Sequence, residues 1–283
     1  MPVIEGGRIT VLVDNCARGR GLLGEHGLAC WVETHRWHLL FDTGQGMALA
    51  HNASLLGIRL ELVNAVVLSH GHYDHTGGLG HVLEIAPQAK VFTHPAALEP
   101  KYSRTNDGAS REIGIPSTVR RAVDGRPTSL ALVERPTEVV GGVFVTGEIP
   151  RRTEYENTGG AFFVDRHGQH VDPLLDDQAM FFDSRQGTIV LLGCGHAGVI
   201  NTLQYIRDLT GGRSIHAVIG GMHLATASRD RMARTIDSLR QLGIERLVPG
   251  HCTGTAATSQ LWSAFPERCA PCGAGAIVEF GIP

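Results

Sequence analysis

The sequence predicts an α/β protein in which helices cover β-sheets, and two features of the chain carry this prediction. In the first part of the chain, short runs rich in Val, Ile and Leu alternate with turns, which is typical of β-strands. In the last part, candidate strands and candidate helices follow one another in turn. This order, with strands first and strand–helix units later, indicates sheets with helices packed on their faces.

The first part of the chain is expected to contain more strands than helices. Residues 47–56 have helical periodicity and stop before Gly57, and residues 80–86 form a second helical pattern that Pro87 ends. A strand over 90–93 follows this second helix. Four earlier strands are predicted over 8–14, 28–33, 37–42 and 63–69.

The segment at about 95–160 has a different composition, with prolines, arginines and turn residues around short strand candidates. A stretch of this kind inside a compact chain usually covers a site. We therefore expect a lid or insertion here, within a single domain that spans residues 1–283.

Regular patterns resume after this segment. Strands are predicted over 161–165, 179–183, 188–192, 215–219, 246–248 and 276–280, and helices over 199–209, 229–242 and 255–265. The alternation of the two supports the α/β class.

Charge and composition exclude several classes of partner. The formal net charge of -3 gives no bulk attraction to nucleic acid or to an anionic membrane. No apolar run approaches the roughly 20 residues of a membrane-spanning helix, and residues 1–10 do not resemble an export signal. The six cysteines follow no disulfide-framework spacing. We therefore expect a cytoplasmic protein with a small-molecule substrate, and the sequence leaves room for a homodimer.

A histidine-rich motif directly follows the apolar run 65–68. Four side chains that can bind metal fall within six positions: His70, His72, Asp74 and His75. Imidazole nitrogen and carboxylate oxygen suit zinc, manganese or iron, and the lack of cysteine in the motif argues against a purely structural zinc site. An exposed histidine cluster without function is the alternative.

Two further histidines stand in the same setting, and they make that alternative weak. His196 and His251 each follow an apolar strand pattern and lie next to or near a glycine. Three strand ends would then deliver histidines to one edge of a sheet.

This pattern resembles the metallo-β-lactamase superfamily, including the glyoxalase II type of hydrolase. The resemblance runs from the string FDTG at 41–44 to the last strand. It implies an αββα sandwich of two mixed sheets covered by helices, with two divalent metal ions at the sheet edge. Zinc is the first choice, with manganese or iron as alternatives. By position, the resemblance implies that His70, His72 and His196 hold one metal and that Asp74, His75 and His251 hold the second.

One departure from the superfamily pattern concerns the second metal. Many members place a bridging aspartate between the last two histidines, whereas the stretch 219–224 contains His223 and no acid. Either His223 takes that place, or a hydroxide alone bridges the metals, or the second metal is weakly held. An ordinary hydrogen-bonding role for His223 is an equal alternative. Asp74 is expected to bind a metal and to accept the proton of the nucleophilic water, and a role as ligand only stays open.

Several strings narrow the resemblance to one subgroup. They lie at 25–28, 69–72, 146–151, 177–179, 193–202, 220–224 and 251–254. Together they resemble the subgroup named for dihydropterin-ribofuranosylaminobenzene-phosphate synthase, whose members are known or proposed to act on pterin diphosphates.

An anionic substrate needs cationic or amide contacts, and the sequence offers four candidates for binding it. Arg151 and Arg152 stand close to Glu148 in one subgroup string, and Thr253 opens a turn before a helix. A solvated or structural ion-pair role is the alternative for each arginine.

The sequence thus leads to one principal function and two alternatives. The principal one is a dinuclear metal-dependent hydrolase of a small, anionic molecule, acting through a metal-activated water. The first alternative is a transferase that joins a dihydropterin methyl diphosphate to an arylamine with release of pyrophosphate. The second is a non-catalytic, metal-dependent ligand-binding protein.

Overall fold

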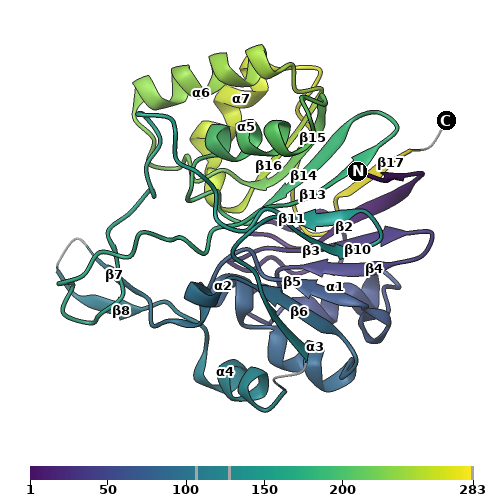
Figure 1. Ribbon diagram of the computed structural model, residues 1–283, viewed down its shortest axis with the longest axis vertical. Helices are drawn as coiled ribbons and strands as arrows, with labels where there is room; N and C mark the ends of the chain where they lie inside the picture. Colours follow the sequence, from purple (N-terminus) through teal and green to yellow (C-terminus); the bar gives the residue numbers. More distant parts are fainter. Residues whose placement is uncertain (106–107, 127–128, 282–283) are drawn as a thin grey trace.

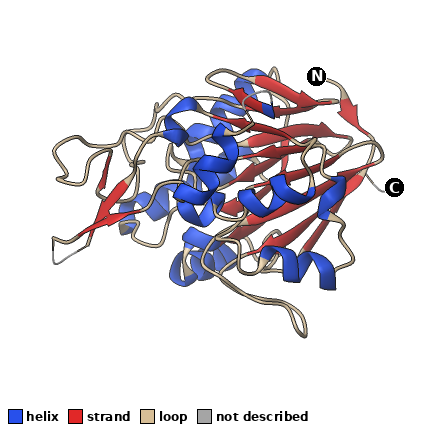
Figure 2. Cartoon of the chain, turned by 90° about the horizontal axis from the view of Figure 1, so that it is seen from below, coloured by secondary structure: helices blue, strands red, loops and turns tan. Residues whose placement is uncertain are grey.

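Two mixed β-sheets pack face to face in the computed structural model, which describes residues 1–105, 108–126 and 129–281. Helices cover the outer face of each sheet, and the four layers are visible in Figure 1, whereas Figure 2 shows helices in front of the strands from below. This is the predicted αββα sandwich.

The N-terminal sheet has the strand order β17-β2-β3-β4-β5-β6-β9. Its strands are β17 (Ile277–Phe280), β2 (Gly7–Val13), β3 (Ala29–Thr34), β4 (His38–Phe41), β5 (Ala65–Val67), β6 (Lys90–Thr93) and β9 (Leu130–Leu132). Neighbours pair antiparallel from β17 to β4 and parallel from β4 to β9. The carboxyl ends of β4 and β5 therefore lie at the same edge.

The C-terminal sheet has the order β10-β11-β13-β14-β15-β16, with β1 beside β13. Its strands are β10 (Thr137–Val140), β11 (Val143–Val145), β13 (Met180–Ser184), β14 (Thr188–Leu192), β15 (Ile215–Gly221), β16 (Arg246–Gly250) and β1 (Val3–Ile4). Because β14, β15 and β16 run parallel, the loops that leave them share one edge.

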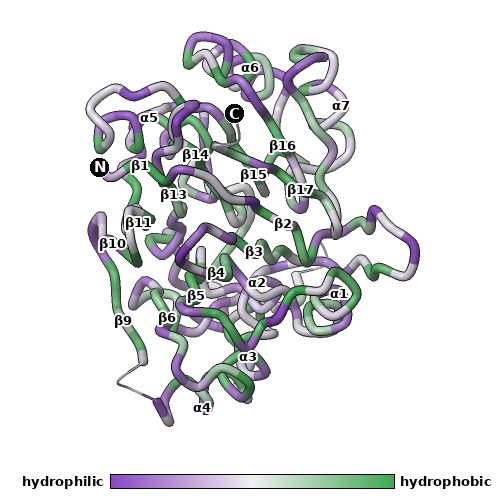
Figure 3. The backbone as a smooth tube through the Cα atoms, turned by 90° about the vertical axis from the view of Figure 1, so that its right-hand side faces the viewer, coloured by the Kyte–Doolittle hydropathy of each residue, from purple (hydrophilic) through white to green (hydrophobic). Residues whose placement is uncertain are grey.

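Alternation along the strands creates the layers. In β14, Ile189 and Leu191 are buried between the sheets, whereas Val190 and Leu192 pack under the helices. Green hydrophobic stretches follow the strands of both sheets in Figure 3. A strand that is apolar on both faces is typical of a sheet covered on both sides.

The longer helices form the outer layers. Over the N-terminal sheet lie α1 (Leu49–Leu55), α3 (Leu79–Ile85) and α4 (Ser117–Asp124), and over the C-terminal sheet lie α5 (Val199–Leu209), α6 (Arg229–Leu242) and α7 (Thr255–Ala264). Short helical turns are α2 (Tyr73–Thr76), η1 (Leu60–Leu62), η2 (Pro95–Leu98) and η4 (His251–Thr253). Within the described residues, no helix has both the length and the apolar character needed to cross a bilayer.

Helix α6 illustrates how sequence sets the bounds. The side chain of Ser228 accepts a hydrogen bond from the Arg231 amide at its start, and Gly243 ends it in the left-handed conformation. The predicted bounds of this helix, of α5, and of strands β6 and β14 agree with the structure.

The segment at about 95–160, expected to be a lid or insertion, contributes strands both to the main sheets and to a small separate sheet. Strands β9, β10 and β11 belong to the two main sheets. A small separate sheet, called the side sheet here, consists of β7 (Tyr102–Arg104), β8 (Ser110–Glu112) and β12 (Phe162–Phe163). Strands β7 and β8 stand away from the sandwich in Figure 1.

Candidate metal centre

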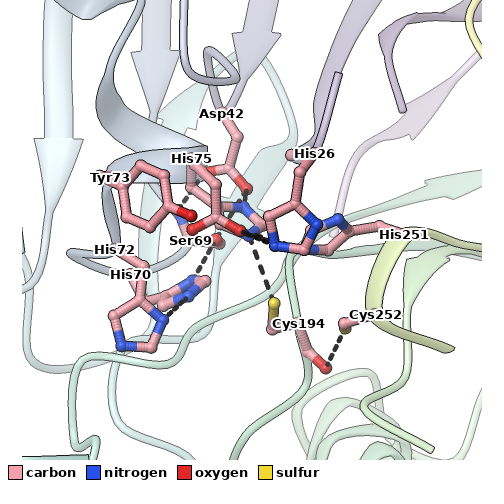
Figure 4. A network of polar contacts seen from close by, with 12 residues as sticks. His26, Asp42, Ser69, His70, His72, Tyr73, His75, Cys194, His251 and Cys252 are labelled. Atoms are coloured by element: carbon pink, nitrogen blue, oxygen red, sulfur yellow. Dashed lines mark hydrogen bonds and ion pairs between the residues drawn. The ribbon is translucent and has the colours of Figure 1, made fainter. Parts of the chain in front are cut away.

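The six predicted metal ligands meet at one edge of the sandwich, although they come from distant parts of the chain. The segment after β5 carries His70, His72, Asp74 and His75, the turn after β14 carries His196, and η4 after β16 begins with His251. All six are buried. Figure 4 shows part of this cluster.

Three non-glycine residues at these strand ends adopt left-handed backbone angles. The φ angles are 57° for Asp42 after β4, 45° for His223 after β15 and 47° for His251 after β16. Such angles are uncommon for residues other than glycine and tend to occur at functional sites.

The first ligand set consists of His70, His72 and His196. Nε2 of His70 lies 2.9 Å from Nδ1 of His72, and the His196 ring centroid lies 4.9 Å from that of His70. Nε2 of His196 is buried and has no hydrogen-bond partner among the described residues. An unpaired buried nitrogen is costly unless a ligand satisfies it.

The second ligand set consists of Asp74, His75 and His251. Nε2 of His75 lies 3.2 Å from Nε2 of His251, and Oδ2 of Asp74 lies 3.5 Å from Nε2 of His251 and 3.8 Å from Nε2 of His75. In a tetrahedral zinc site with bonds of about 2.0 to 2.1 Å, ligand atoms lie about 3.3 Å apart. The residues therefore fit a metal ion.

Hydrogen bonds on the far side of the rings fix the histidines of both sets. Nδ1 of His75 donates to Asp42 Oδ2 at 2.7 Å, and Nδ1 of His70 donates to Ser69 Oγ at 2.8 Å. Ser69 in turn donates from Oγ to Asp42 Oδ2 at 2.7 Å. In the neutral form of each ring, these bonds place the proton on Nδ1 and turn Nε2 toward the metal site.

The two C-terminal histidines are held in the same way. Nδ1 of His196 donates to the Thr158 carbonyl at 2.8 Å, and Nδ1 of His251 donates to Asn15 Oδ1 at 2.9 Å. Four of the five histidine ligands are thus oriented for metal binding through Nε2.

Burial and charge set the protonation of the cluster. Burial lowers the pKa of His72 to about 3 and the pKa of His251 to about 4, so both rings are neutral at neutral pH. For His75, burial opposes protonation, but Asp42 and Asp74 outweigh it and raise the pKa to about 9. Burial works against the ionised form of Asp74, yet the charge of His75 and a hydrogen bond from His26 hold its pKa well below the usual range.

His223, one of the two predicted catalytic residues, lies beside the first set. Its ring centroid is 4.3 Å from that of His196, and Gly159 has no side chain at the point where a Cβ would meet the His223 ring. Among the described residues, its ligand atom groups with the sulfurs of Cys194 and Cys252. His223 is therefore near the centre without being grouped with Asp74, His75 and His251.

A cavity of about 220 Å³ opens onto both ligand sets. It is lined by His26, His72, Tyr73, Asp74, Ser103, Arg111, Ile113, Phe162, Cys194, His196, His223, His251 and Cys252. Ser103, Arg111 and Phe162 come from the side sheet, which therefore forms one wall of the cavity.

The four predicted substrate-binding residues are not among those that line the cavity in the described structure. Arg151 donates to the carbonyls of Pro173 and Leu174, and Arg152 pairs with Asp208 at 2.6 Å. Glu148 is exposed. Thr253 is buried, and its Oγ1 accepts a hydrogen bond from the Met222 amide at 3.1 Å. Arg151, Arg152 and Thr253 thus use their polar groups in contacts within the protein, and substrate binding by these four residues stays a prediction.

Sequence reasoning missed three residues at the centre. Arg111 of β8 lines the cavity and donates to the Tyr73 hydroxyl at 2.9 Å. Cys194 and Cys252 also line it. The available signal for both cysteines was proximity, since Cys194 lies two positions before His196 and Cys252 directly follows His251.

Comparison with known proteins agrees with this geometry. A family model described as the metallo-beta-lactamase superfamily matches residues 25–251. The chain belongs to this superfamily. The structure of Tm1679, described as a metal-dependent hydrolase of the beta-lactamase superfamily, is 32% identical, with a TM-score of 0.83 over 96% of this chain and 98% of that chain.

Two relatives from Methanocaldococcus jannaschii are similar over most of this chain. One is named 7,8-dihydropterin-6-methyl-4-(beta-D-ribofuranosyl)-aminobenzene-5'-phosphate synthase and is 28% identical over 96% of this chain and 95% of its own. The other, Uncharacterized protein MJ0448, is 32% identical over 89% of this chain and 93% of its own. The subgroup resemblance predicted from the sequence strings is thereby confirmed.

Proposed function

We propose that this protein is a metal-dependent hydrolase that acts on a small, anionic molecule. Two divalent ions, zinc first with manganese or iron as alternatives, would be held by the two ligand sets. The observation that carries the proposal is that both sets, with four of their histidines oriented by hydrogen bonds for binding through Nε2, open onto one cavity. Such a metal pair supplies an activated water at neutral pH and polarises a carbonyl or phosphoryl oxygen of the substrate.

Proton handling falls to Asp74 and His26. Oδ2 of Asp74 lies 3.1 Å from Nε2 of His26, whose side chain is 57% exposed at the cavity mouth. Asp74 would accept a hydrogen bond from the attacking water, and His26 would pass the proton on to solvent. His223, close to His196 and partly buried in the cavity wall, is a candidate for donating to the leaving group.

Substrate binding is assigned to the side sheet. The Arg111 guanidinium is the one arginine that lines the cavity in the described residues, and arginine binds carboxylate and phosphate groups through paired hydrogen bonds. A cavity of about 220 Å³ is smaller than the 300 Å³ or more of typical ligand pockets. The reacting end of the substrate is therefore small, and the rest of the molecule would extend along the open side.

The test begins with chelated protein that is reloaded with zinc, manganese or iron. The reloaded protein is assayed on a panel of phosphate esters, carboxylic esters, thioesters and lactones. We expect metal-dependent turnover on at least one anionic member and its loss in His70→Ala. His81→Ala, which removes an exposed histidine outside the centre, is the matched control. Equal inactivity of chelated and reloaded protein over the whole panel would contradict the proposal.

A pterin transferase is the second candidate, favoured by the relative of that subgroup, which is 28% identical over 96% of this chain. In this reaction the arylamine nitrogen attacks the methylene carbon of a dihydropterin methyl diphosphate, the carbon–oxygen bond breaks, and pyrophosphate leaves. Arg111 would then contact the diphosphate. Release of pyrophosphate that requires both substrates favours this candidate, whereas release that needs only one of them favours hydrolysis. Tight retention of a ligand without turnover favours the binding-protein alternative.

We also propose a compartment, a class of partner and an oligomeric state for this protein. Its six cysteines are free, which supports a reducing compartment such as the cytoplasm. We expect a small-molecule substrate, no nucleic-acid or membrane partner, and a homodimer that size measurement in solution would detect.

A further inference from the structure

The space between the two ligand sets contains a sulfur atom. Cys194 Sγ lies within 4.8 Å of the ligand atoms of His70 and His196, and also within 4.8 Å of those of His75 and His251. Its distance to Nε2 of His75 is 3.3 Å. Cys194 is therefore the residue that the two sets have in common.

The spacing agrees with metal ligation. A zinc–nitrogen bond of about 2.05 Å and a zinc–sulfur bond of about 2.3 Å at the tetrahedral angle place nitrogen and sulfur about 3.6 Å apart. The sulfur groups with His75 and His251, and Asp74 Oδ2 lies 3.8 Å and 3.5 Å from the Nε2 atoms of these two histidines. His196 also groups with this sulfur, and its buried Nε2 has no hydrogen-bond partner among the described residues.

The neighbouring strand end leaves no room for a carboxylate at this point. A Cβ added to Gly220 would lie 2.0 Å from the Leu192 carbonyl oxygen, and one added to Gly221 would lie 2.3 Å from the Gly193 carbonyl oxygen. Among the described residues, Asp74 is the one carboxylate that groups with the histidines of the centre. The end of β15 therefore packs against the backbone around Cys194 and does not supply a shared acidic ligand.

The second cavity cysteine is placed differently. Cys252 groups with Cys194 and His223, and its Sγ donates to the Cys194 carbonyl at 3.5 Å. Within the part of the chain that the structure describes, it groups with neither the His70 and His196 pair nor the His75 and His251 pair.

We propose that Cys194 is a ligand of both metals, with its sulfur bridging the first and second sets. This inference rests on the proposed function for the presence of two metals. On binding, Sγ gives its proton to solvent and bonds to both ions, as a ligating thiol is deprotonated. A bridging sulfur would add to the centre the shared negative ligand that the stretch 219–224 lacks.

The test is X-ray absorption at the metal edge of protein loaded with two equivalents of cobalt or zinc. We use Cys252→Ser protein, in which Cys194 is the one cysteine left among the residues that line the cavity. A bridging sulfur gives about one sulfur neighbour per metal at about 2.3 Å. About half a sulfur per metal means that Cys194 binds a single ion and overturns the bridge. No sulfur neighbour overturns ligation altogether.

Two variants check the assignment. In Cys194→Ser loaded with cobalt, we expect loss of the sulfur-to-cobalt charge-transfer absorption, whereas Cys16→Ser, which removes an exposed thiol, keeps it. If Cys194→Ser does not fold, the absorption data on Cys252→Ser decide the question alone. Persistence of the charge-transfer band in folded Cys194→Ser contradicts the proposal.

Failure of this inference differs from failure of the proposed function. Protein that binds two metals through sulfur and turns over nothing supports the ligand and contradicts the hydrolase. Protein that turns over substrate without metal–sulfur scattering supports the hydrolase and contradicts Cys194 as a ligand. Protein that takes up no metal overturns both.

Discussion

The buried ion cluster around Lys101 offers the sharpest test of how the fold supports the metal centre. Lys101 Nζ lies 2.8 Å from Asp172 Oδ2 and 3.0 Å from Asp176 Oδ1, and its side chain is 1% exposed. Asp176 Oδ2 also accepts a hydrogen bond from the Gly71 amide at 2.8 Å. Because Gly71 separates two predicted metal ligands, this lysine stabilises the conformation of the metal-binding segment through Asp176.

Replacing Lys101 with methionine keeps most of the side-chain volume and removes the charge. Each ion pair at this distance is worth about 6 kcal/mol of Coulomb energy at an effective dielectric constant of about 20, much of which desolvation offsets. Leaving two buried carboxylates without their cation costs about 3 to 5 kcal/mol. With a urea dependence of about 3 kcal/mol per molar, the unfolding midpoint falls by about 1 to 1.7 M.

The assay is urea unfolding of the metal-free protein at neutral pH, with Lys90→Met as the control. Lys90 is exposed, with its ammonium 5.2 Å from the Phe92 ring centroid, so its replacement is expected to change the unfolding free energy by no more than about 0.5 kcal/mol. Adding Asp172→Asn to Lys101→Met should recover part of the loss, because one uncompensated carboxylate disappears. A loss below about 1 kcal/mol in Lys101→Met refutes the reasoning.

The pH dependence of this difference has a defined sign. Burial opposes the charge of Lys101, but Asp176 and Asp172 outweigh it and raise its pKa above the ordinary 10.5. The stabilisation is therefore fully present below pH 10.5 and is lost as the pH rises through the folded-state pKa. The gap between wild type and Lys101→Met should stay constant from pH 7 to pH 10 and narrow above that range.

Three further predictions concern the centre itself. Asp42→Asn weakens the hydrogen bond that orients His75 and should lower the affinity for one metal by about 10- to 100-fold. Competition with a chromophoric chelator measures this affinity. Unchanged affinity for both metals contradicts the role of Asp42. Arg111→Ala should raise KM for an anionic substrate by about 10- to 100-fold with kcat little changed, because the substrate loses a cationic contact. Arg151→Ala should leave both constants unaltered. The opposite pattern would show that Arg151, and not Arg111, binds the substrate. Metal at 100 times its dissociation constant should stabilise the fold by about 2.7 kcal/mol and raise Tm by about 5 to 10 °C in calorimetry, and an unchanged Tm would mean that metal does not bind the native state selectively.

The convergence of the six predicted metal ligands at one edge was predictable from the sequence, because the strand ends that carry them have a local signal. His70, His196 and His251 each follow an apolar run that becomes a strand, and the strand end fixes where each side chain lies. The helices after residue 198 were predictable for the same reason, since their periodicity is local, and in α6 the Ser228 cap is local as well.

The partners of these ligands were not predictable, because they depend on contacts between distant parts of the chain. Asn15 and His251 are 236 positions apart, and Asp42 and His75 are 33 positions apart. The arginine that lines the cavity was missed for a related reason. Arg151 lies in a subgroup string, but the fold directs its guanidinium to the Leu174 carbonyl, whereas Arg111 lies in a polar hairpin whose position over the cavity follows only from the pairing of β8 with β7.

The second ligand set also connects the two sheets. Asp74 and His75 follow β5 of the N-terminal sheet, whereas His251 follows β16 of the C-terminal sheet. A metal held by all three binds only a chain in which the sheets are already packed, so its binding energy adds to the stability of the sandwich as a whole. Asn15 strengthens this connection, because it leaves β2 of the N-terminal sheet and accepts a hydrogen bond from His251. Loss of metal should therefore lower the free energy of global unfolding, and it should not act only on the loops at the edge.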